Sequence, residues 1–383
     1  MTTSRWLVPL SDLDVDGELV GAAEEAVRSG WWSMGPRVAE FEQGFAELCE
    51  TRHAIAVANG TAALHLALLA AGCSPGDEVV LPSLTFVAAA NMVAVCGATP
   101  VFCDVVGPRD LNLDPRDLEA AITPATRALL VLHYGGFACD MDAVMEIADR
   151  RGLVVIEDAA HAPGGTWRGR KCGSIGHVGC FSFFSNKNLP IGEGGMIVTD
   201  DDALAERIRL LRSHGMTTLT WDRQRGHAHS YDVVAQGLNY RLDEVRAAIG
   251  LVQLRRLPET NAARARVAAF YRETLDGVEG ITVPFPNGDA NESSAHHLAV
   301  VVLPEDASRA SVRAELEERR IQTSVHYPPI HHFSAYAERA TRSLPRTDEL
   351  AERILTLPLS AHMREDHPGI VAEALVDAVR RAR

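Results

Sequence analysis

The first 200 residues alternate between short apolar runs and longer stretches in which apolar residues recur every three or four positions. Short apolar runs are typical of buried parallel strands, and the longer stretches are typical of helices with one apolar face. The predicted strands are 54–58, 78–81, 100–103, 128–133, 153–156, 180–184 and 196–199, and the helices between them include 62–71, 86–96 and 141–151. This alternation predicts an α/β fold with a mostly parallel seven-stranded sheet and helices on both faces. The last two strands are too close for a crossover helix, so we expect them to be antiparallel.

The pattern changes toward the N-terminus. Residues 1–30 carry a helical pattern over 16–29, and we expect them to form an arm against the body of the protein. The stretch 37–49 is an amphipathic helix, with apolar residues at spacings of three and four. A second strong amphipathic helix, 242–257, is expected to end the large domain, which we place at 31–257.

Residues 258–383 alternate differently and predict a smaller α+β domain. Its expected elements are strands 298–303 and 321–326 and helices 311–319, 348–354 and 368–381. Between the two regular regions, 216–235 is polar and predicts a long loop. Long loops within a compact domain tend to be functional.

Composition excludes several classes of function. The 383 residues carry a net charge of −14, which argues against nucleic acid or an anionic membrane as the main partner. No apolar stretch approaches the roughly 20 residues of a membrane span, and the N-terminus has no signal-peptide pattern. The seven cysteines are odd in number and show no C-x-x-C, which indicates reduced structural thiols. We therefore expect a cytoplasmic enzyme.

Polar residues at the predicted sheet edge suggest the chemistry. Asp158 follows a buried strand, and Lys187 lies on a short loop between two others. Strand 54–58 is followed by Asn59-Gly60-Thr61 and a helix, whose free N–H groups and positive end suit a phosphate. Alone, this start could be an ordinary helix capped by Thr61, Asp158 a surface acid and Lys187 a solvated charge. Together with the aromatic Phe86 they match the needs of pyridoxal phosphate: a Schiff-base lysine, an acid for the ring nitrogen, a phosphate cradle and a stacking ring.

The chain resembles the DegT/DnrJ/StrS family of sugar aminotransferases. The matching segments include VANGTAALHLAL, VIEDAAHAPG, GCFSFFSNKNLPIGEGGMIVTD, LNYRLDEVRAAIGLVQLRRL and VHYPPIHHF, in family order over nearly the whole chain. The resemblance implies an aspartate-aminotransferase-like large domain (fold type I of pyridoxal phosphate enzymes) with a smaller C-terminal domain. It also implies a homodimer with shared active sites.

The resemblance implies a role for each matching residue. Lys187 would be the Schiff-base lysine, Asp158 the partner of the pyridine nitrogen and Phe86 the stacking ring. The other cofactor contacts would be the backbone at Thr61 and Ala62, Ser182, His161 near the ring hydroxyl, and Asn239, which would reach the phosphate of the neighbouring subunit.

Two residues depart from the family pattern. His177 stands where a Gly-Asp pair is common, and this change would alter a loop contact. Pro190 stands where small residues are usual, and it would stiffen the lysine loop. Neither change affects an expected catalytic role.

Substrate residues are expected on loops near the site. Arg223, Arg225 and Arg241 would bind a diphosphate, since the arginine fork pairs with two oxygens at once. The spacing of His326, His331 and His332 could suggest a metal cluster, but the adjacent prolines favour extended backbone, so we expect no metal. The resemblance instead places His326 and Tyr327 at the mouth of the sugar site.

The expected function is amino transfer from glutamate or glutamine to a keto sugar, carried on a nucleoside diphosphate. The GEGGM stretch slightly favours C4 over C3 as the reacting carbon. The alternatives are a keto-cyclitol aminotransferase, a sugar deaminase or dehydrase with the same cofactor, and a sensor that kept the fold without turnover. The intact Lys187, Asp158 and Thr61 argue against the sensor.

Overall fold

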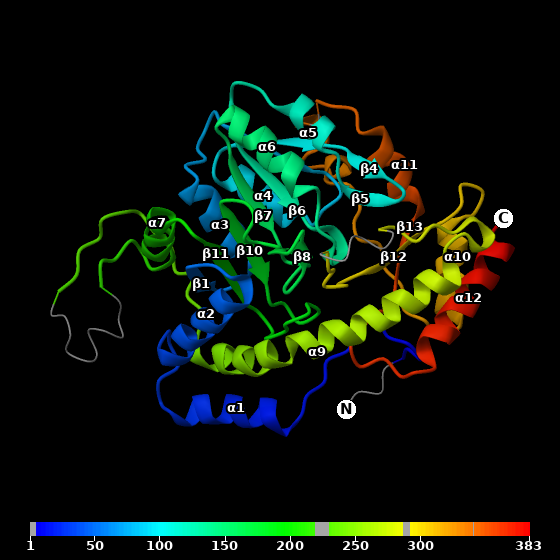
Figure 1. Ribbon diagram of the computed structural model, residues 1–383, viewed down its shortest axis with the longest axis horizontal. Helices are drawn as coiled ribbons and strands as arrows, with labels where there is room; N and C mark the ends of the chain where they lie inside the picture. Colours follow the sequence, from blue (N-terminus) through cyan, green and yellow to red (C-terminus); the bar gives the residue numbers. More distant parts are fainter. Residues whose placement is uncertain (1–4, 219–229, 286–291, 340) are drawn as a thin grey trace.

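The computed structural model describes residues 5–218, 230–285, 292–339 and 341–383. At its centre is a seven-stranded sheet with the order β1-β11-β10-β7-β6-β2-β3 (Figure 1). The strands are β1 (His53–Val57), β2 (Glu78–Pro82), β3 (Thr99–Cys103), β6 (Thr126–Leu132), β7 (Val154–Asp158), β10 (Val178–Ser182) and β11 (Gly195–Thr199). Strands β10, β7, β6, β2 and β3 are parallel, whereas β11 is antiparallel to both β1 and β10. The seven predicted strands and the antiparallel last pair are confirmed.

Helices cover both faces of the sheet because its strands are apolar on both sides. On one face, α3 (Gly60–Ala70), α4 (Ala88–Val95) and α7 (Asp202–Arg212) pack over Ile55 and Leu130. On the other, α2 (Pro36–Cys49) and α9 (Glu244–Leu275) pack over Phe181, and α5 (Pro115–Ala121) and α6 (Met141–Arg151) pack over Leu129. Each fully buried aliphatic or aromatic side chain contributes roughly 1.5–3 kcal/mol. The packing of helices on both faces therefore stabilises the sheet.

Helix α9 is longer than predicted. The expected helix 242–257 continues through Pro258 to Leu275 as a single helix of 32 residues. Its first half packs against α1 (Gly17–Arg28) and α2, while Tyr271 and Leu275 join a separate apolar core. The helix thus contacts both expected domains, and the boundary between 257 and 258 stays a prediction.

That second core belongs to the C-terminal elements. Strands β12 (Ala299–Val302) and β13 (Ile354–Leu357) are antiparallel and pack with α10 (Arg309–Glu318) and α12 (His367–Arg381). The other elements are α11 (Pro345–Arg353), the strand pairs β4 (Val105–Gly107) with β5 (Asp110–Leu113) and β8 (Thr166–Trp167) with β9 (Arg170–Lys171), and the 3-10 turns η1 (Tyr134–Gly136), η2 (Val278–Gly280), η3 (Ile330–His332) and η4 (Ala337–Arg339).

The predicted strand 321–326 is wrong. Ile321 and Ser324 each form only an isolated bridge, with Val8 and Thr356 respectively. Because the two bridges go to different parts of the chain, no ladder develops. The predicted helix 348–354 is shifted, since α11 ends at Arg353 and the next residue begins β13.

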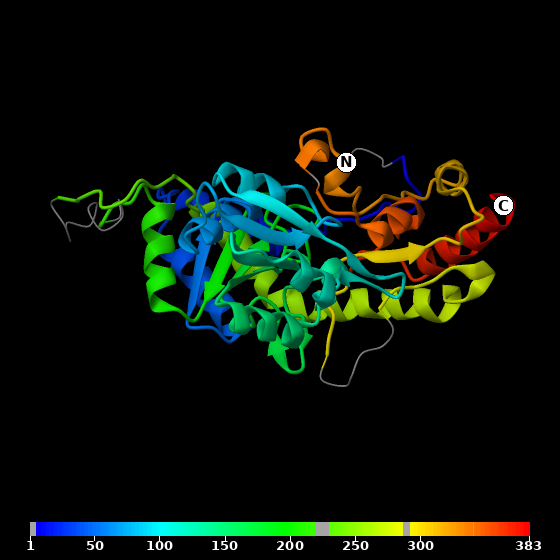
Figure 2. The same ribbon diagram turned by 90° about the horizontal axis from the view of Figure 1, so that it is seen from above.

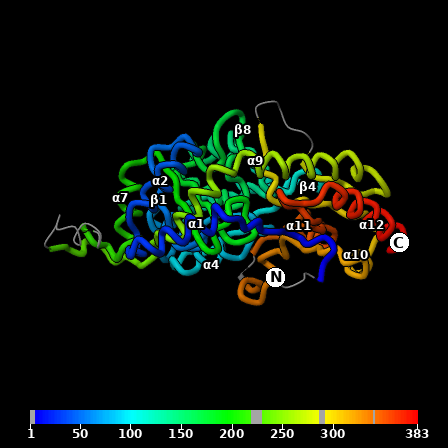
Figure 3. The backbone as a smooth tube through the Cα atoms, turned by 90° about the horizontal axis from the view of Figure 1, so that it is seen from below, coloured from blue at the N-terminus to red at the C-terminus, as the bar shows by residue number. Residues whose placement is uncertain are grey.

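The described part of the N-terminal segment lies against the rest of the protein, and the arm at 1–30 stays a prediction. Helix α1 packs along α9, where Arg256 forms ion pairs with Asp16 and Glu18. Before α1, the N–H of Leu7 donates to the carbonyl of Arg320 at 2.8 Å. Figures 2 and 3 show this segment running from α1 to the C-terminal elements. It therefore connects the two cores.

Two expectations from composition can be checked here. All seven cysteines are buried and none forms a disulfide, as expected of structural thiols. Among the residues described, no helix is both long enough and apolar enough to cross a membrane.

Candidate active site

The predicted site residues gather where several strands of the sheet end. Asp158 is the last residue of β7, and it lies in register with Cys180 of the parallel strand β10. Ser182 ends β10 and faces Gly195 of β11, which in turn faces Val57 at the end of β1. Helix α3 begins shortly after β1. The strand register thus brings the start of α3, the end of β10 and the end of β7 to one edge.

The start of α3 forms a tight cradle against Ser182. Asn59 caps the helix, because its Oδ1 accepts a hydrogen bond from the N–H of Ala62 at 2.8 Å; Thr61 is not the cap. A Cβ at Gly60 would lie 2.7 Å from the Cβ of Ser182, so only glycine fits this approach. The helix N-terminus and the Ser182 hydroxyl are a donor set suited to a phosphate. The phosphate contacts of Thr61, Ala62 and Ser182 stay predictions, and the Ala62 N–H is already engaged by the cap.

Lys187 and Asp158 influence each other's pKa at this edge. Lys187 is partly buried, and removal from water lowers its amine pKa to about 8, with the Asp158 charge opposing the shift. Burial raises the pKa of Asp158, although its Oδ1 accepts a hydrogen bond from the Ala160 N–H at 3.1 Å. A buried carboxylate of this kind calls for a cationic partner. A protonated pyridine nitrogen is such a partner, so the acid fits the expected cofactor.

A stack of aromatic rings lies beside these two groups. The ring of His161 stacks on that of His297, with centroids 4.4 Å apart, and its Nε2 lies 2.9 Å from the Tyr327 hydroxyl. Burial holds the pKa of both histidines well below the usual value, so both rings are neutral. Phe86 lies at the outer end of this stack, 6.0 Å from the Tyr327 ring, and is 56% exposed. An aromatic ring left open next to Tyr327 fits a stacking partner for a flat cofactor.

The sequence analysis did not predict that Asn188 and His297 belong to this arrangement. Asn188 follows Lys187 and is buried, and its Oδ1 lies 3.0 Å from Nδ1 of His297. Its Nδ2 donates to the Ala295 carbonyl and to Asn261 of α9. These bonds fix the lysine loop to the C-terminal part of the chain. The only sequence signal was a second polar residue in the lysine turn, because the partners lie more than 70 positions away.

Other candidates lie apart from this group or elsewhere in the chain. Asn239 is exposed on the single chain, next to Ser213 in an isolated bridge. Arg241 is bridged to Val57, and its Nη1 is buried without a hydrogen-bond partner among the residues described. Arg223 and Arg225 lie outside the described residues. His326 is engaged internally, because its Nδ1 lies 3.0 Å from the Thr356 hydroxyl and its carbonyl accepts a hydrogen bond from the Tyr134 hydroxyl.

The two departures from the family pattern have local consequences. The ring Nδ1 of His177 accepts a hydrogen bond from the Val155 N–H at 3.0 Å, and its carbonyl accepts one from the Thr199 hydroxyl. His177 therefore ties β7 to β11 away from the lysine. Pro190 lines the same cavity as Lys187.

A cavity of about 400 Å³ opens beside Lys187. Its lining includes Asn186, Arg264 and His362, together with residues of the segment before α1. A larger cavity of about 1050 Å³ lies along α9, lined by Trp167, Phe285 and His296, and does not include Lys187. Of the two cavities, only the smaller is lined by Lys187, and its lining includes none of Asp158, His161 and Ser182.

A partly buried lysine and a buried acid at the edge of a parallel sheet, next to a helix start suited to a phosphate, fit a pyridoxal phosphate-dependent enzyme. Residues 14–376 match the DegT/DnrJ/EryC1/StrS aminotransferase family, and the chain belongs to that family. The GDP-perosamine synthase of Caulobacter vibrioides is 44% identical over 364 residues, which cover 94% of this chain and 95% of the relative.

Solved structures agree with this assignment. S. venezuelae DesV superposes with a TM-score of 0.90 at 39% identity, covering 98% of this chain and 99% of DesV. A structure described as DesI in the presence of its TDP-sugar product superposes with a TM-score of 0.87 at 35% identity, covering 99% of this chain and 94% of DesI. The fold, the cofactor and the reaction class predicted from sequence are confirmed.

The cradle gives a first testable prediction. Gly60→Ala places a methyl group against Ser182 and forces the helix start away from β10, so we expect cofactor affinity to fall by about tenfold or more. Cofactor release during dialysis, followed by absorbance, measures this loss. Gly21→Ala is the matched control, because nothing lies within 4 Å of the added Cβ. Equal retention of cofactor by the two variants would show that the cradle does not hold the phosphate.

Proposed function

We propose that this enzyme transfers an amino group from glutamate or glutamine to C4 of a keto sugar carried on a nucleoside diphosphate. The proposal rests on Lys187 and Asp158, which lie close enough at the sheet edge to influence each other's pKa, beside the start of α3. The names of two relatives, a GDP-perosamine synthase and a protein with a TDP-sugar product, support the acceptor class. The GEGGM stretch after the lysine loop supports C4.

In this proposal each residue of the site has a separate role in amino transfer. Bound pyridoxal phosphate supplies a ring that stabilises negative charge on the carbon attached to the migrating nitrogen. Lys187, with a pKa lowered to about 8, is suited to accept a proton from that carbon and to return it near neutral pH. Asp158 would hold the positive charge of the ring nitrogen. The neutral His161 and Tyr327 would orient the ring through their mutual hydrogen bond.

The active unit in this proposal is a homodimer with shared sites. Asn239 is exposed on the isolated chain, and the lining of the cavity at Lys187 does not include it. An exposed asparagine next to a backbone bridge can donate to a group on another copy of the chain. Asn239 would therefore complete the phosphate site of the partner subunit.

In this proposal Arg264 recognises the amino donor. It is 6% exposed, its Nη1 donates to the Leu359 carbonyl at 3.1 Å, and its Nε has no hydrogen-bond partner among the residues described. Burial lowers its pKa to about 10, and within the described residues no carboxylate pairs with it. A buried guanidinium without a carboxylate is costly unless an anion arrives. Since Arg264 lines the cavity that holds Lys187, the α-carboxylate of the donor is suited to this role.

Removing the charge of Arg264 should weaken binding of the amino donor only. Arg264→Gln keeps a donor for the Leu359 carbonyl, and we expect it to raise KM for glutamate by about 10- to 100-fold. KM for the keto sugar should change little in steady-state assays of both substrates. Arg255→Gln is the control, because Arg255 also donates to a backbone carbonyl, that of Leu251, but does not line the cavity. Equal rises in both KM values would contradict the assignment.

The proposed function is tested by separating the two halves of the reaction. Glutamate alone should remove the visible absorbance of the lysine-bound cofactor and release 2-oxoglutarate. Nucleoside diphosphate keto sugars should then restore the absorbance, and NMR of the product identifies the aminated carbon. Restoration by keto-cyclitols only, or ammonia release without a donor, would contradict the proposal.

A further inference from the structure

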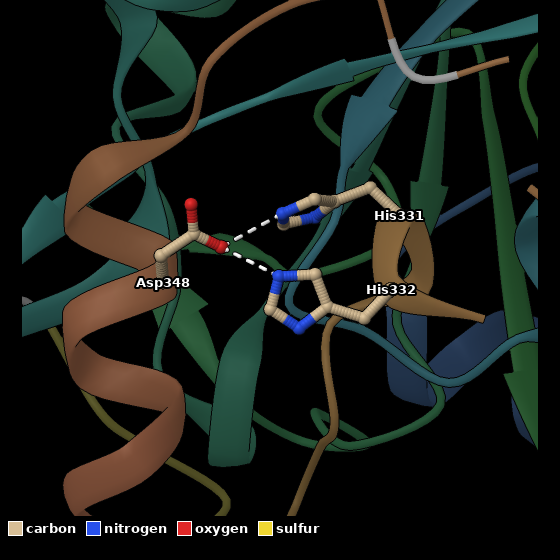
Figure 4. Close-up of side chains that lie close together, drawn as sticks. All are labelled: His331, His332 and Asp348. Carbon is tan, nitrogen blue, oxygen red and sulfur yellow. Dashed lines mark hydrogen bonds and ion pairs between the residues drawn. The ribbon is translucent and has the colours of Figure 1, made fainter. Parts of the chain in front are cut away.

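Two neighbouring histidines and an aspartate converge in the C-terminal part of the chain (Figure 4). None of the three lines the cavity of Lys187. Nε2 of His331 and Nε2 of His332 each lie 2.8 Å from the same oxygen, Oδ1 of Asp348. All three ligand atoms lie within 4.8 Å of one another. The histidines belong to η3 and the aspartate to α11, so two separate elements supply the cluster.

We propose that His331, His332 and Asp348 bind one divalent transition-metal ion, with zinc the best match. Two imidazole nitrogens and one carboxylate oxygen are a ligand set of zinc, and water completes the tetrahedron. Ligand atoms about 2.0–2.1 Å from zinc lie roughly 3.3 Å apart. The observed spacing of 2.8 Å is that of the metal-free, hydrogen-bonded cluster, and small side-chain rotations open it to the coordinated spacing.

Ser83 gives His331 the outer contact that a ligating histidine needs. The Ser83 hydroxyl lies 2.7 Å from Nδ1 of His331 and also accepts a hydrogen bond from the His331 N–H. A hydroxyl can donate to Nδ1 while Nε2 bonds to Asp348, and it can accept from Nδ1 when Nε2 binds a metal. Such contacts fix the tautomer and the orientation of metal-binding histidines.

The site is open to ions and connected to the active-site loop. The side chains of His332 and Asp348 are 49% and 45% exposed, so an ion can enter from solvent. Ser83 follows β2 on the loop that carries Phe86, and its carbonyl accepts a hydrogen bond from the N–H of Ile330. A bound ion would therefore tie η3 and α11 to this loop. None of the three ligands lines the cavity of Lys187. The ion would therefore act by stabilising the position of the loop after β2.

The sequence analysis grouped different residues. It considered His326 together with His331 and His332, and it expected no metal. In the structure, His326 bonds to Thr356 instead, and Asp348 takes the third position. No spacing in the sequence brings residue 348 to the two histidines.

The test uses the holoenzyme without an affinity tag. Isothermal titration with ZnCl₂ should show one saturable site per chain in the wild-type protein. His332→Ala and Asp348→Asn should each weaken this site at least about tenfold, the loss typical of a removed ligand or its support. Cobalt(II) should give the absorption bands of a tetrahedral site in the wild type and not in His332→Ala.

A second pair of residues provides the control. Nε2 of His53 lies 2.7 Å from Asp202, but no third ligand joins this pair within the described chain. His53→Ala should therefore bind zinc as the wild type does. The proposal is overturned if the wild type shows no saturable site, if His332→Ala binds zinc equally well, or if His53→Ala loses as much affinity.

Discussion

Lys187→Ala is expected to reduce amino transfer by at least about 10³-fold, because in the proposed mechanism this one side chain both anchors the cofactor and moves the proton. The variant should still bind pyridoxal phosphate through the cradle, but without the visible absorbance of a lysine-bound cofactor. Single-turnover assays with glutamate measure the loss of the donor half. A variant that keeps one tenth of the wild-type rate would assign the proton transfer to another group.

The chain offers a matched control, since it contains only two lysines, Lys171 and Lys187. Lys171 lies in β9, with its Nζ 3.8 Å from Glu50, and lines the larger cavity. Lys171→Ala should keep activity and absorbance. After borohydride reduction, peptide mapping should find the cofactor on Lys187 alone, and any label on Lys171 would contradict the assignment.

The large-domain fold could be predicted because its signals are local. Each strand of a covered parallel sheet is a short apolar run, so β6 and β7 are visible without their neighbours. The same reasoning failed at 321–326, where apolar residues such as Ile321 pack in single bridges to distant segments. It also ended α9 too early, because Pro258 in the sequence suggests a break that the packing on both cores overrides.

The residues of the site also fall into two groups, those that the local strand pattern predicts and those that only long-range packing brings together. Asp158 ends a strand, and the turn before α3 and Lys187 come within a few residues after strands, so the strand pattern predicts all of them near one edge. His297 and Arg264 reach that edge through packing between distant segments, and a lone histidine or a helical arginine carries no signal of this. Local chemistry could therefore be predicted, whereas the groups added by the C-terminal part required the structure.

Asp158→Asn is expected to slow both halves of the reaction by about 10²- to 10³-fold, the cost of losing one preorganised charge. Burial raises the pKa of Asp158, so a cation that faces this carboxyl favours its charged form. In the proposed mechanism the protonated ring nitrogen would supply that cation, and an amide would not stabilise its charge. Pre-steady-state rates with glutamate and with the keto sugar measure the effect, which should be similar in the two directions.

The neighbouring residue separates this loss from damage to the fold. Glu157 lies on the opposite side of β7, is fully buried, and accepts hydrogen bonds from the N–H groups of Gly173 and Ile175. Glu157→Gln turns an amide toward these donors and should lower the melting temperature, because each unmet buried bond costs about 1–3 kcal/mol. Asp158→Asn should leave the melting temperature near that of the wild type. If Asp158→Asn instead unfolds as easily as Glu157→Gln, its slow turnover would reflect an altered strand, and the charge on the ring nitrogen would have to be held by another group.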